Sequence, residues 1–264
     1  MLLAASSLMQ RELVRFFRQR SRVMSALLTP LIFWFLVGSG LGKSFRPPGA
    51  PDDVGPLEYF FPGTLLMIVL FTAIFATISI IEDRREGFLQ SVLVAPVSRS
   101  GIVLGKMLGG TLLSLAQVLP LLAVAPLAGL HMAPAAFVLA AAILTLVAFG
   151  LTGLGFILAW RLDSTQGFHA IMNLVLLPMW MLSGAFFPAS GAPAWLRAVM
   201  AANPMTYALA ALRRGIYLGG DVDHVLPQGT PSLGVAVAVS VFFAVLTFAV
   251  AVQQARRTTS GDLQ

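Results

Sequence analysis

Long stretches without a charged side chain dominate this sequence. Charged residues are absent from five segments, 23–42, 59–81, 107–160, 164–196 and 224–255. A helix that crosses a lipid bilayer needs about 20 consecutive apolar residues, so four of these segments hold one span each. The third segment is long enough for two spans, with a break at 129–134. The sequence therefore predicts six transmembrane helices, at 23–42, 61–81, 105–128, 135–160, 167–187 and 233–252.

The composition indicates the same class of protein. Hydrophobic residues make up 58% of the chain and charged residues only 11%, whereas soluble domains average about 25% charged residues. The apolar runs are continuous, which favours helices over the alternating strands of a membrane β-barrel. We therefore predict an all-α integral membrane protein with a single transmembrane domain over residues 1–264. The absence of cysteine excludes disulfides and thiolate metal sites.

The distribution of lysine and arginine predicts the orientation in the membrane. Six spans place the N-terminus, residues 82–106, residues 161–166 and the C-terminus on one side, which carries 12 of the 17 Lys and Arg residues. Because cytoplasmic loops are enriched in Lys and Arg, both termini are predicted to be cytoplasmic. The net charge of +6 is then a topology signal and does not indicate a nucleic-acid partner.

Residues 1–22 are predicted to form an amphipathic helix in the cytoplasmic interface. Four arginines recur at spacings of four, three and four and therefore share one helical face: Arg11, Arg15, Arg18 and Arg22. A basic amphipathic helix of this kind binds membrane lipids in the interface. The alternative is that the arginines are ordinary positive charges flanking a span.

Five consecutive charged positions, Glu82 to Glu86, separate the second and third spans. Charge is costly in lipid, so this segment must face water or a protein partner. A glycine that permits a bend and a set of apolar residues at helical spacing follow it. We predict a short helix over 83–96 that docks on a partner, the alternative being an ordinary solvated loop. The residues assigned to docking are Glu82, Arg85, Glu86, Gly87, Leu89 and Pro96.

Residues 188–214 are too polar and too rich in proline to span a bilayer, yet too apolar for an ordinary loop. Two short helices divided at Asn203 and Pro204 fit this segment, because asparagine caps a helix and proline suits its first turn. We predict that these helices form a re-entrant hairpin in the outer leaflet.

Residues 37–44 resemble a nucleotide-binding P-loop, but the pattern fails. Valine stands at 37, where the motif requires glycine, and a predicted membrane span precedes it. The chain also lacks the zinc and serine-nucleophile motifs of intramembrane enzymes. We therefore expect no catalysis, no metal and no ATP site on this chain.

Three segments resemble the permease subunits of ABC-2 type exporters. The first runs from the charged positions at 82–86 through Pro96 and Arg99 to Lys106, the second covers 182–188 and the third covers 203–213. They occur in the order and at the depth typical of that family, and the match extends over almost the whole chain. The motif residues of the second and third segments are Gly184, Phe187, Pro188, Asn203, Pro204, Tyr207 and Arg213.

The resemblance implies a homodimer or heterodimer of permeases in a bacterial plasma (inner) membrane, each docked on a separate ABC ATPase subunit. ATP and Mg²⁺ would bind to the ATPase, and this chain would need no cofactor. The helix at 83–96 would be the family's coupling helix, and 188–214 would be its re-entrant element near the outer exit.

We therefore predict the permease of an exporter that moves a lipophilic or amphipathic compound, such as a drug or a lipid-like molecule, out of the cell. Within the same family the alternative is export of a polysaccharide or lipid-linked glycan. Outside it, the alternative is a channel or ion-coupled carrier that works without an ATPase. The lack of acidic residues in the span centres argues against ion coupling.

Overall fold

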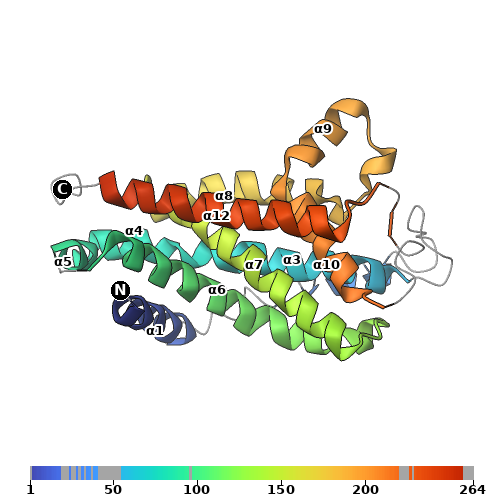
Figure 1. The fold of residues 1–264 in the computed structure, drawn as a ribbon, viewed down its shortest axis with the longest axis horizontal. Coiled ribbons are helices and arrows are strands. Elements are labelled where there is room, and N and C mark those ends of the chain that lie inside the picture. The colour runs from blue at the N-terminus through green and yellow to red at the C-terminus, as the bar shows by residue number, and fades with distance from the viewer. Residues whose placement is uncertain are drawn as a thin grey trace.

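The structure is a computed structural model in which residues 2–18, 55–94, 97–219, 226–227 and 229–257 are described, with positions 24, 28, 31–32, 34–36 and 38–40. Throughout these ranges the regular elements are helices, and the long ones run side by side in an elongated bundle (Figure 1). In chain order the α-helices are α1 (Leu2–Arg18), α3 (Pro56–Ala76), α4 (Ile78–Arg85), α5 (Phe88–Val94), α6 (Arg99–Ala123), α7 (Pro134–Ala159), α8 (Thr165–Trp180), α9 (Ala194–Ala202), α10 (Pro204–Ile216) and α12 (Leu233–Arg257).

Within the described ranges, five helical segments are long and apolar enough to cross a membrane. They are Pro56–Arg85, Arg99–Ala123, Pro134–Ala159, Thr165–Ala185 and Leu233–Arg257. These segments correspond to the second to sixth predicted spans. Half of the predicted first span, 23–42, lies outside the described residues, and the positions described within it are helical.

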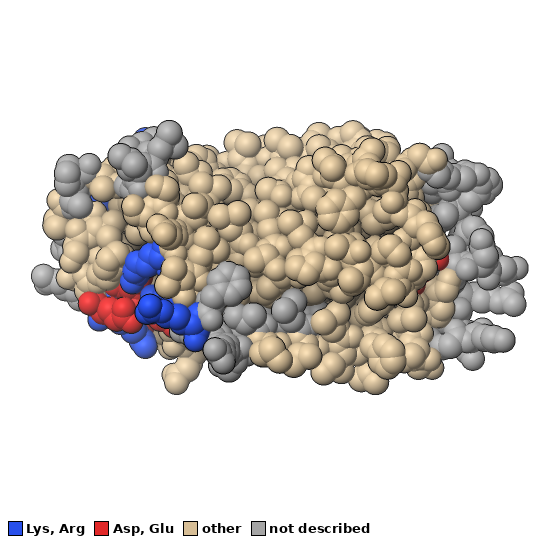
Figure 2. All heavy atoms as spheres, turned by 90° about the horizontal axis from the view of Figure 1, so that it is seen from below, with Lys and Arg blue, Asp and Glu red and all other residues tan. Residues whose placement is uncertain are grey.

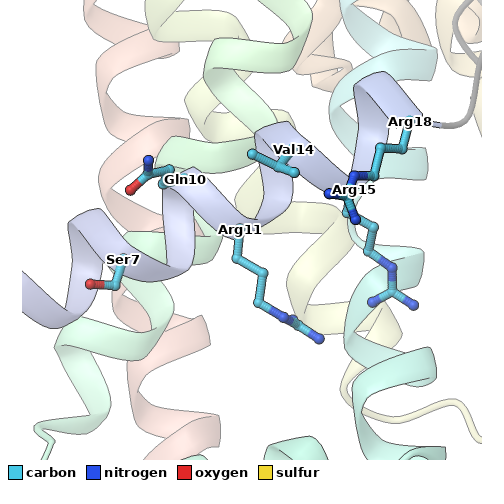
Figure 3. Close-up of a pocket in the computed structure, with 6 residues that line it drawn as sticks. All are labelled: Ser7, Gln10, Arg11, Val14, Arg15 and Arg18. Carbon is cyan, nitrogen blue, oxygen red and sulfur yellow. The ribbon is translucent and has the colours of Figure 1, made fainter.

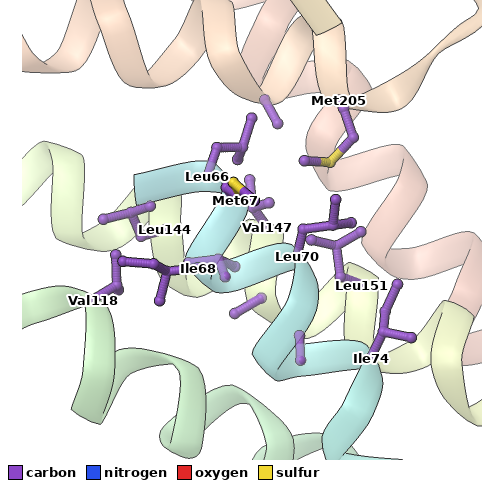
Figure 4. Packing of buried hydrophobic residues seen from close by; sticks show 14 of the residues in the cluster. Leu66, Met67, Ile68, Leu70, Ile74, Val118, Leu144, Val147, Leu151 and Met205 are labelled. Atoms are coloured by element: carbon purple, nitrogen blue, oxygen red, sulfur yellow. The ribbon is translucent and has the colours of Figure 1, made fainter. Parts of the chain in front are cut away.

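The helix α3 lies at the centre of the bundle and is buried on almost every side. Ile68 and Leu70 pack among side chains of α6 and α7, including Val118, Leu144 and Leu151 (Figure 4). A helix that is surrounded by protein is apolar all round, which explains the uninterrupted apolar run in this part of the sequence. By contrast, α8 and α12 expose many large apolar side chains, as helices at the lipid-facing surface do.

The helix of the second span is longer than predicted. Only a slight irregularity at Thr77 separates α3 from α4, so the helix continues to Arg85 and the charged positions lie on its last turn. The predicted helix at 83–96 is therefore divided, because Gly87 takes the left-handed conformation (φ +73°) and α5 starts only after it. Glycine ends helices in this way because it has no Cβ to clash.

The predicted outer segment, 188–214, contains two helices that meet at Asn203, as expected. A short 3₁₀ turn (Ala189–Gly191) leads into α9, which projects from the side of the bundle, whereas α10 packs inside it (Figure 1). The second helix continues to Ile216, two residues beyond the predicted boundary.

Candidate functional site

Most of the charged side chains visible in Figure 2 gather at one end of the bundle, where α1, α4 and α5 meet. We call this the charged end. There α1 lies across the bundle helices and packs closely on α6 (Figure 3). A Cβ atom at Gly105 would lie 2.8 Å from the carbonyl oxygen of Ala5, and one at Gly109 would lie 3.0 Å from the Cβ of Glu12. The glycine face of α6 therefore admits the backbone of α1, as small-residue patterns do between membrane helices.

Asp83 is the centre of a buried charge cluster at this end. Its carboxylate is fully buried and accepts two hydrogen bonds from Arg11, at 2.9 and 2.7 Å, and one from Arg15 at 3.1 Å. Lys106 of α6 donates hydrogen bonds to Asp83 and to Glu12, and the side chains of Lys106 and Glu12 are also buried. The cluster joins α1, α4 and α6. The hydrogen bonds that Arg11 donates to Asp83 raise the pKa of Arg11 above its ordinary value. Such buried ions are tolerated only when they are paired and hydrogen-bonded.

The predicted docking carboxylates face α1. Arg15 lies 3.0 Å from a carboxylate oxygen of Glu82 and 3.2 Å from one of Glu86. The guanidinium of Arg11 also stacks over the ring of Phe88, 3.8 Å from its centroid. Because Phe88 begins α5, the amphipathic helix holds both sides of the turn at 87.

The arginines of the same turn bind the connection between α7 and α8. Arg84 donates to the carbonyl oxygen of Trp160 and, at 2.8 Å, to the carboxylate of Asp163. The Nε of Arg85 donates to the backbone oxygen of Asp163 at 3.0 Å. The last turn of α4 is therefore fixed to three other parts of the chain.

Only part of α5 is free to meet a partner. Leu89 is buried in the protein's own core, so it lies away from the surface predicted for docking. Ser91 and Val94 are exposed, with 76% of Val94 accessible to solvent, and Glu86 beside them is also exposed. Pro96 lies outside the described residues.

A shallow hollow follows the outer face of α1 (Figure 3). Its lining residues are Ser7, Gln10, Arg11, Val14, Arg15 and Arg18. The basic face predicted from the arginine spacing therefore exists, but two of its arginines are committed to the buried cluster. Arg18 is exposed, and Arg22 lies outside the described residues.

At the opposite end of the bundle, Asn203 links α10 to the end of α8. Its Oδ1 accepts a hydrogen bond from the backbone nitrogen of Met205 at 3.0 Å and thereby caps α10. Its Nδ2 donates to the carbonyl oxygen of Met179 at 2.7 Å. Pro204 occupies the first helical position, and the hydroxyl of Tyr207 donates to the carbonyl oxygen of Ala201 at 2.9 Å. The residues predicted for this motif thus fasten α8, α9 and α10 together.

The segment before this cap contains a π-helical turn, Met181–Ala185, in which Gly184 has φ +91°. The indole of Trp180 donates to the carbonyl oxygen of Gly63 at 2.8 Å, which holds the turn against α3. Phe187 is half-buried, and Pro188 is buried where the chain leaves the turn. A left-handed glycine is needed here because other residues rarely adopt this conformation.

Arg213 lies in the last turn of α10 and is 6% exposed. Its guanidinium stacks over the ring of Tyr59, 4.8 Å from the centroid. It also lines a small cavity of about 50 Å³ between the π-helical turn, α10 and the residues that precede α12. The two predicted motifs, 182–188 and 203–213, therefore meet around one space.

Sequence reasoning placed Asp83 and Lys106 in the first motif but assigned neither of them a role at the charged end, and it did not single out Glu12. Two signals for them are present in the sequence. Glu12 is an acidic residue in a basic helix, and the spacing of Gly101, Gly105 and Gly109 marks a face for close helix packing.

Comparison with known proteins identifies the family of this multi-span helical protein. Residues 4–217 match the model of the ABC-2 type transporter family, and the chain belongs to that family. A transport permease, ycf38, of Cyanophora paradoxa is 27% identical over 78% of this chain and 71% of its own length. Nodulation protein J of Rhizobium leguminosarum bv. viciae is 27% identical over 77% of each chain. The daunorubicin resistance ABC transporter permease protein DrrB1 of Streptomyces coeruleorubidus is 24% identical over 73% of this chain and 67% of its own.

Proposed function

We propose that this chain is the membrane-spanning subunit of an ATP-driven exporter and that α5 docks it on a separate ABC ATPase subunit. One observation carries the proposal: α5 stands at the charged end with one side fixed in the core and the other exposed. Leu89 anchors the inner side, while Ser91 and Val94 form an outward surface beside Glu86. A short, rigidly held helix of this kind is suited to receive a push from another protein.

The buried charge cluster connects α5 to other helices, so that movement of α5 caused by the ATPase would be transmitted into the bundle. Arg11 binds both Asp83 and Phe88, so α1 and α5 move with the end of α4. Lys106 extends the connection to α6, and Arg84 extends it to the turn before α8. Because close-packed interiors transmit displacement instead of absorbing it, movement of α5 reaches α1, α4, α6 and the connection between α7 and α8.

In this proposal ATP and Mg²⁺ bind to the ATPase, and this chain provides the path across the membrane. The charged end faces the cytoplasm of a bacterial cell, in line with the excess of Lys and Arg on that side. The cargo is a lipophilic or amphipathic compound that leaves toward the outside. The name of the Streptomyces relative, a permease for daunorubicin resistance, supports this class of cargo.

The working unit contains two permease copies. The exposed face of α8 is a candidate surface for the second copy, since it carries large apolar side chains along its length. They are Ile171, Leu174, Val175 and Leu177, and Leu174 is 76% exposed. In such a dimer the α8 faces of the two copies pack against each other at the centre, and the exposed apolar face of α12 contacts the lipid.

Co-expression with an ABC ATPase encoded in the same genome tests the proposal. Val94→Asp should reduce both co-purification of the ATPase and stimulation of its ATP hydrolysis, because it places a charge in the docking surface. Arg257→Gln is the matched control, since Arg257 is an exposed residue at the end of α12. If Val94→Asp and Arg257→Gln retain the ATPase equally well, α5 is not the docking element. Transport by the purified chain without any ATPase would overturn the exporter assignment itself.

A further inference from the structure

Asn173 is a polar residue on the surface of α8 at the depth of the lipid. It lies near the middle of the candidate span Thr165–Ala185, about 12 Å from Thr165 along the helix at 1.5 Å per residue. Its side chain is exposed, and within the described ranges it takes part in no hydrogen bond. Lipid chains offer no donor or acceptor, so an amide in this position requires a polar partner.

Thr145 shows how another exposed polar side chain at membrane depth is satisfied. It lies within the span Pro134–Ala159 and donates a hydrogen bond to the carbonyl oxygen of Ala141, one turn back on its own helix, at 2.8 Å. A hydroxyl group can be satisfied in this way. An asparagine amide has two donor hydrogens and an acceptor oxygen, so Asn173 needs a partner outside its own helix.

The exposed residues around Asn173 form a seam along α8. They recur at spacings of four, three and four, and they are Gln166, Ala170, Asn173 and Leu177. This is the spacing of residues that meet a second helix in a left-handed helix pair. The small side chain of Ala170 permits a close approach of the two helices. The residues through which α8 packs on its own bundle follow a different line, Phe168, Met172, Leu176 and Trp180.

A second copy of this chain matches the seam. Two copies inserted in the same direction bring their α8 helices together as a parallel pair, and around a twofold axis each seam residue meets its own counterpart. Because an amide both donates and accepts, Asn173 is complementary to itself. The first predicted span, 23–42, is a poorer match, since its polar side chains are three hydroxyls and the indole of Trp34, which donates to the carbonyl oxygen of Leu57.

We propose that α8 packs on α8 of a second copy along this seam and that the two Asn173 amides hydrogen-bond to each other at the twofold axis. The inference rests on the dimer of the proposed function and narrows its surface to the side of α8 that carries Asn173 and Leu177. A buried asparagine pair fixes the register of two helices, because any other alignment leaves both amides unpaired. The seam therefore selects a partner with asparagine at the same place, which favours a homodimer.

Dimerisation of the purified protein in liposomes tests the seam, measured by energy transfer between copies labelled at their C-termini. Asn173→Leu should weaken the dimer about tenfold, because interhelical hydrogen bonds in the membrane are lost. Asn173→Gln keeps a donor and an acceptor and should restore most of the affinity. Thr145→Val is the matched control, since it removes an exposed hydroxyl from another span and should leave the dimer unchanged.

A second variant separates packing from hydrogen bonding. Ala170→Phe places a bulky ring on the seam without removing the amide, and it should also weaken the dimer. Both altered side chains are exposed, so the unfolding temperature of each variant in detergent should match that of the wild type. Equal dimerisation of the wild type, Asn173→Leu and Ala170→Phe would overturn the seam while leaving the dimer itself in place. A wild type that stays monomeric would overturn the dimer and the seam together.

Discussion

Arg11 of α1 and Asp83 of α4 form a two-point ion pair across 72 residues of sequence, with N–O distances of 2.9 and 2.7 Å. Bidentate geometry of this kind is the strongest arrangement for an arginine and a carboxylate. Because Asp83 is fully buried, the pair makes α1 part of the core of the charged end. An interfacial helix held only by lipid would lack such a contact.

Asp83→Asn should therefore destabilise the protein strongly. The substitution leaves Lys106 and Arg11 facing a neutral amide, and breaking a buried ion pair costs about 3–5 kcal/mol. Asp163→Asn is the control, because Asp163 pairs with Arg84 but its side chain is 90% exposed, and such surface pairs contribute at most about 1 kcal/mol. Unfolding of both variants in detergent measures the difference. Equal stability of the two would contradict a structural role for the cluster.

The contact between α1 and α6 makes a separate prediction. In Gly105→Ala the new Cβ would lie 2.8 Å from the backbone oxygen of Ala5, so α1 must shift. We expect a loss of about 1–3 kcal/mol, which is typical of overpacking, and faster proteolysis of the N-terminal helix. Gly167→Ala is the matched control, since its Cβ would meet Ser164 at an ordinary 3.6 Å. There the change should be neutral or stabilising by up to about 1 kcal/mol. Similar proteolysis of the two variants would rule out close packing of α1.

Much of this fold could be predicted from the sequence, because the position of each membrane span depends only on the charge and apolar length of its own segment. The cap at Asn203 and the bend at Gly87 were predictable for the same reason, since each depends on local chemistry. The role of Asp83 was not predictable, because it depends on which helices meet. Leu89 shows the same limit: its helical spacing gave an apolar face, but only packing decides whether that face turns inward. The helix of the second span ends at Arg85 and not at the predicted residue 81, because charged residues can extend a membrane helix beyond the lipid.

The absence of cysteine from the chain permits a direct test of the proposed dimer. A single cysteine at Leu174, which is 76% exposed on α8, should form a disulfide-linked dimer when the protein is oxidised in membranes. Phe242→Cys is the control, because Phe242 is similarly exposed, at 66%, but lies on α12. Cross-linking through Phe242 and not through Leu174 would move the interface to α12.

The pair of Tyr217 and Glu58 predicts how stability depends on pH at the opposite end of the bundle. The hydroxyl of Tyr217 donates to a carboxylate oxygen of Glu58 at 2.9 Å. Burial, and then the negative charge of Glu58, raise the pKa of Tyr217 above its ordinary value of 10.0. Below pH 10 the tyrosine is protonated in both the folded and the unfolded chain. As the pH rises above 10, only the unfolded chain releases the proton, so the free energy of unfolding falls.

Tyr217→Phe should remove this alkaline loss, which reaches about 1.4 kcal/mol per pH unit for one group. At neutral pH the same variant should be less stable than the wild type, because it loses a hydrogen bond to a charged group worth about 1.5–3 kcal/mol. The two unfolding curves should therefore converge between pH 8 and pH 11. Tyr207→Phe is the control, since this hydroxyl binds a backbone oxygen in place of a carboxylate, and its curve should stay parallel to that of the wild type. If the curve for Tyr217→Phe also stays parallel to that of the wild type, burial and Glu58 do not raise the pKa of Tyr217 in the folded chain.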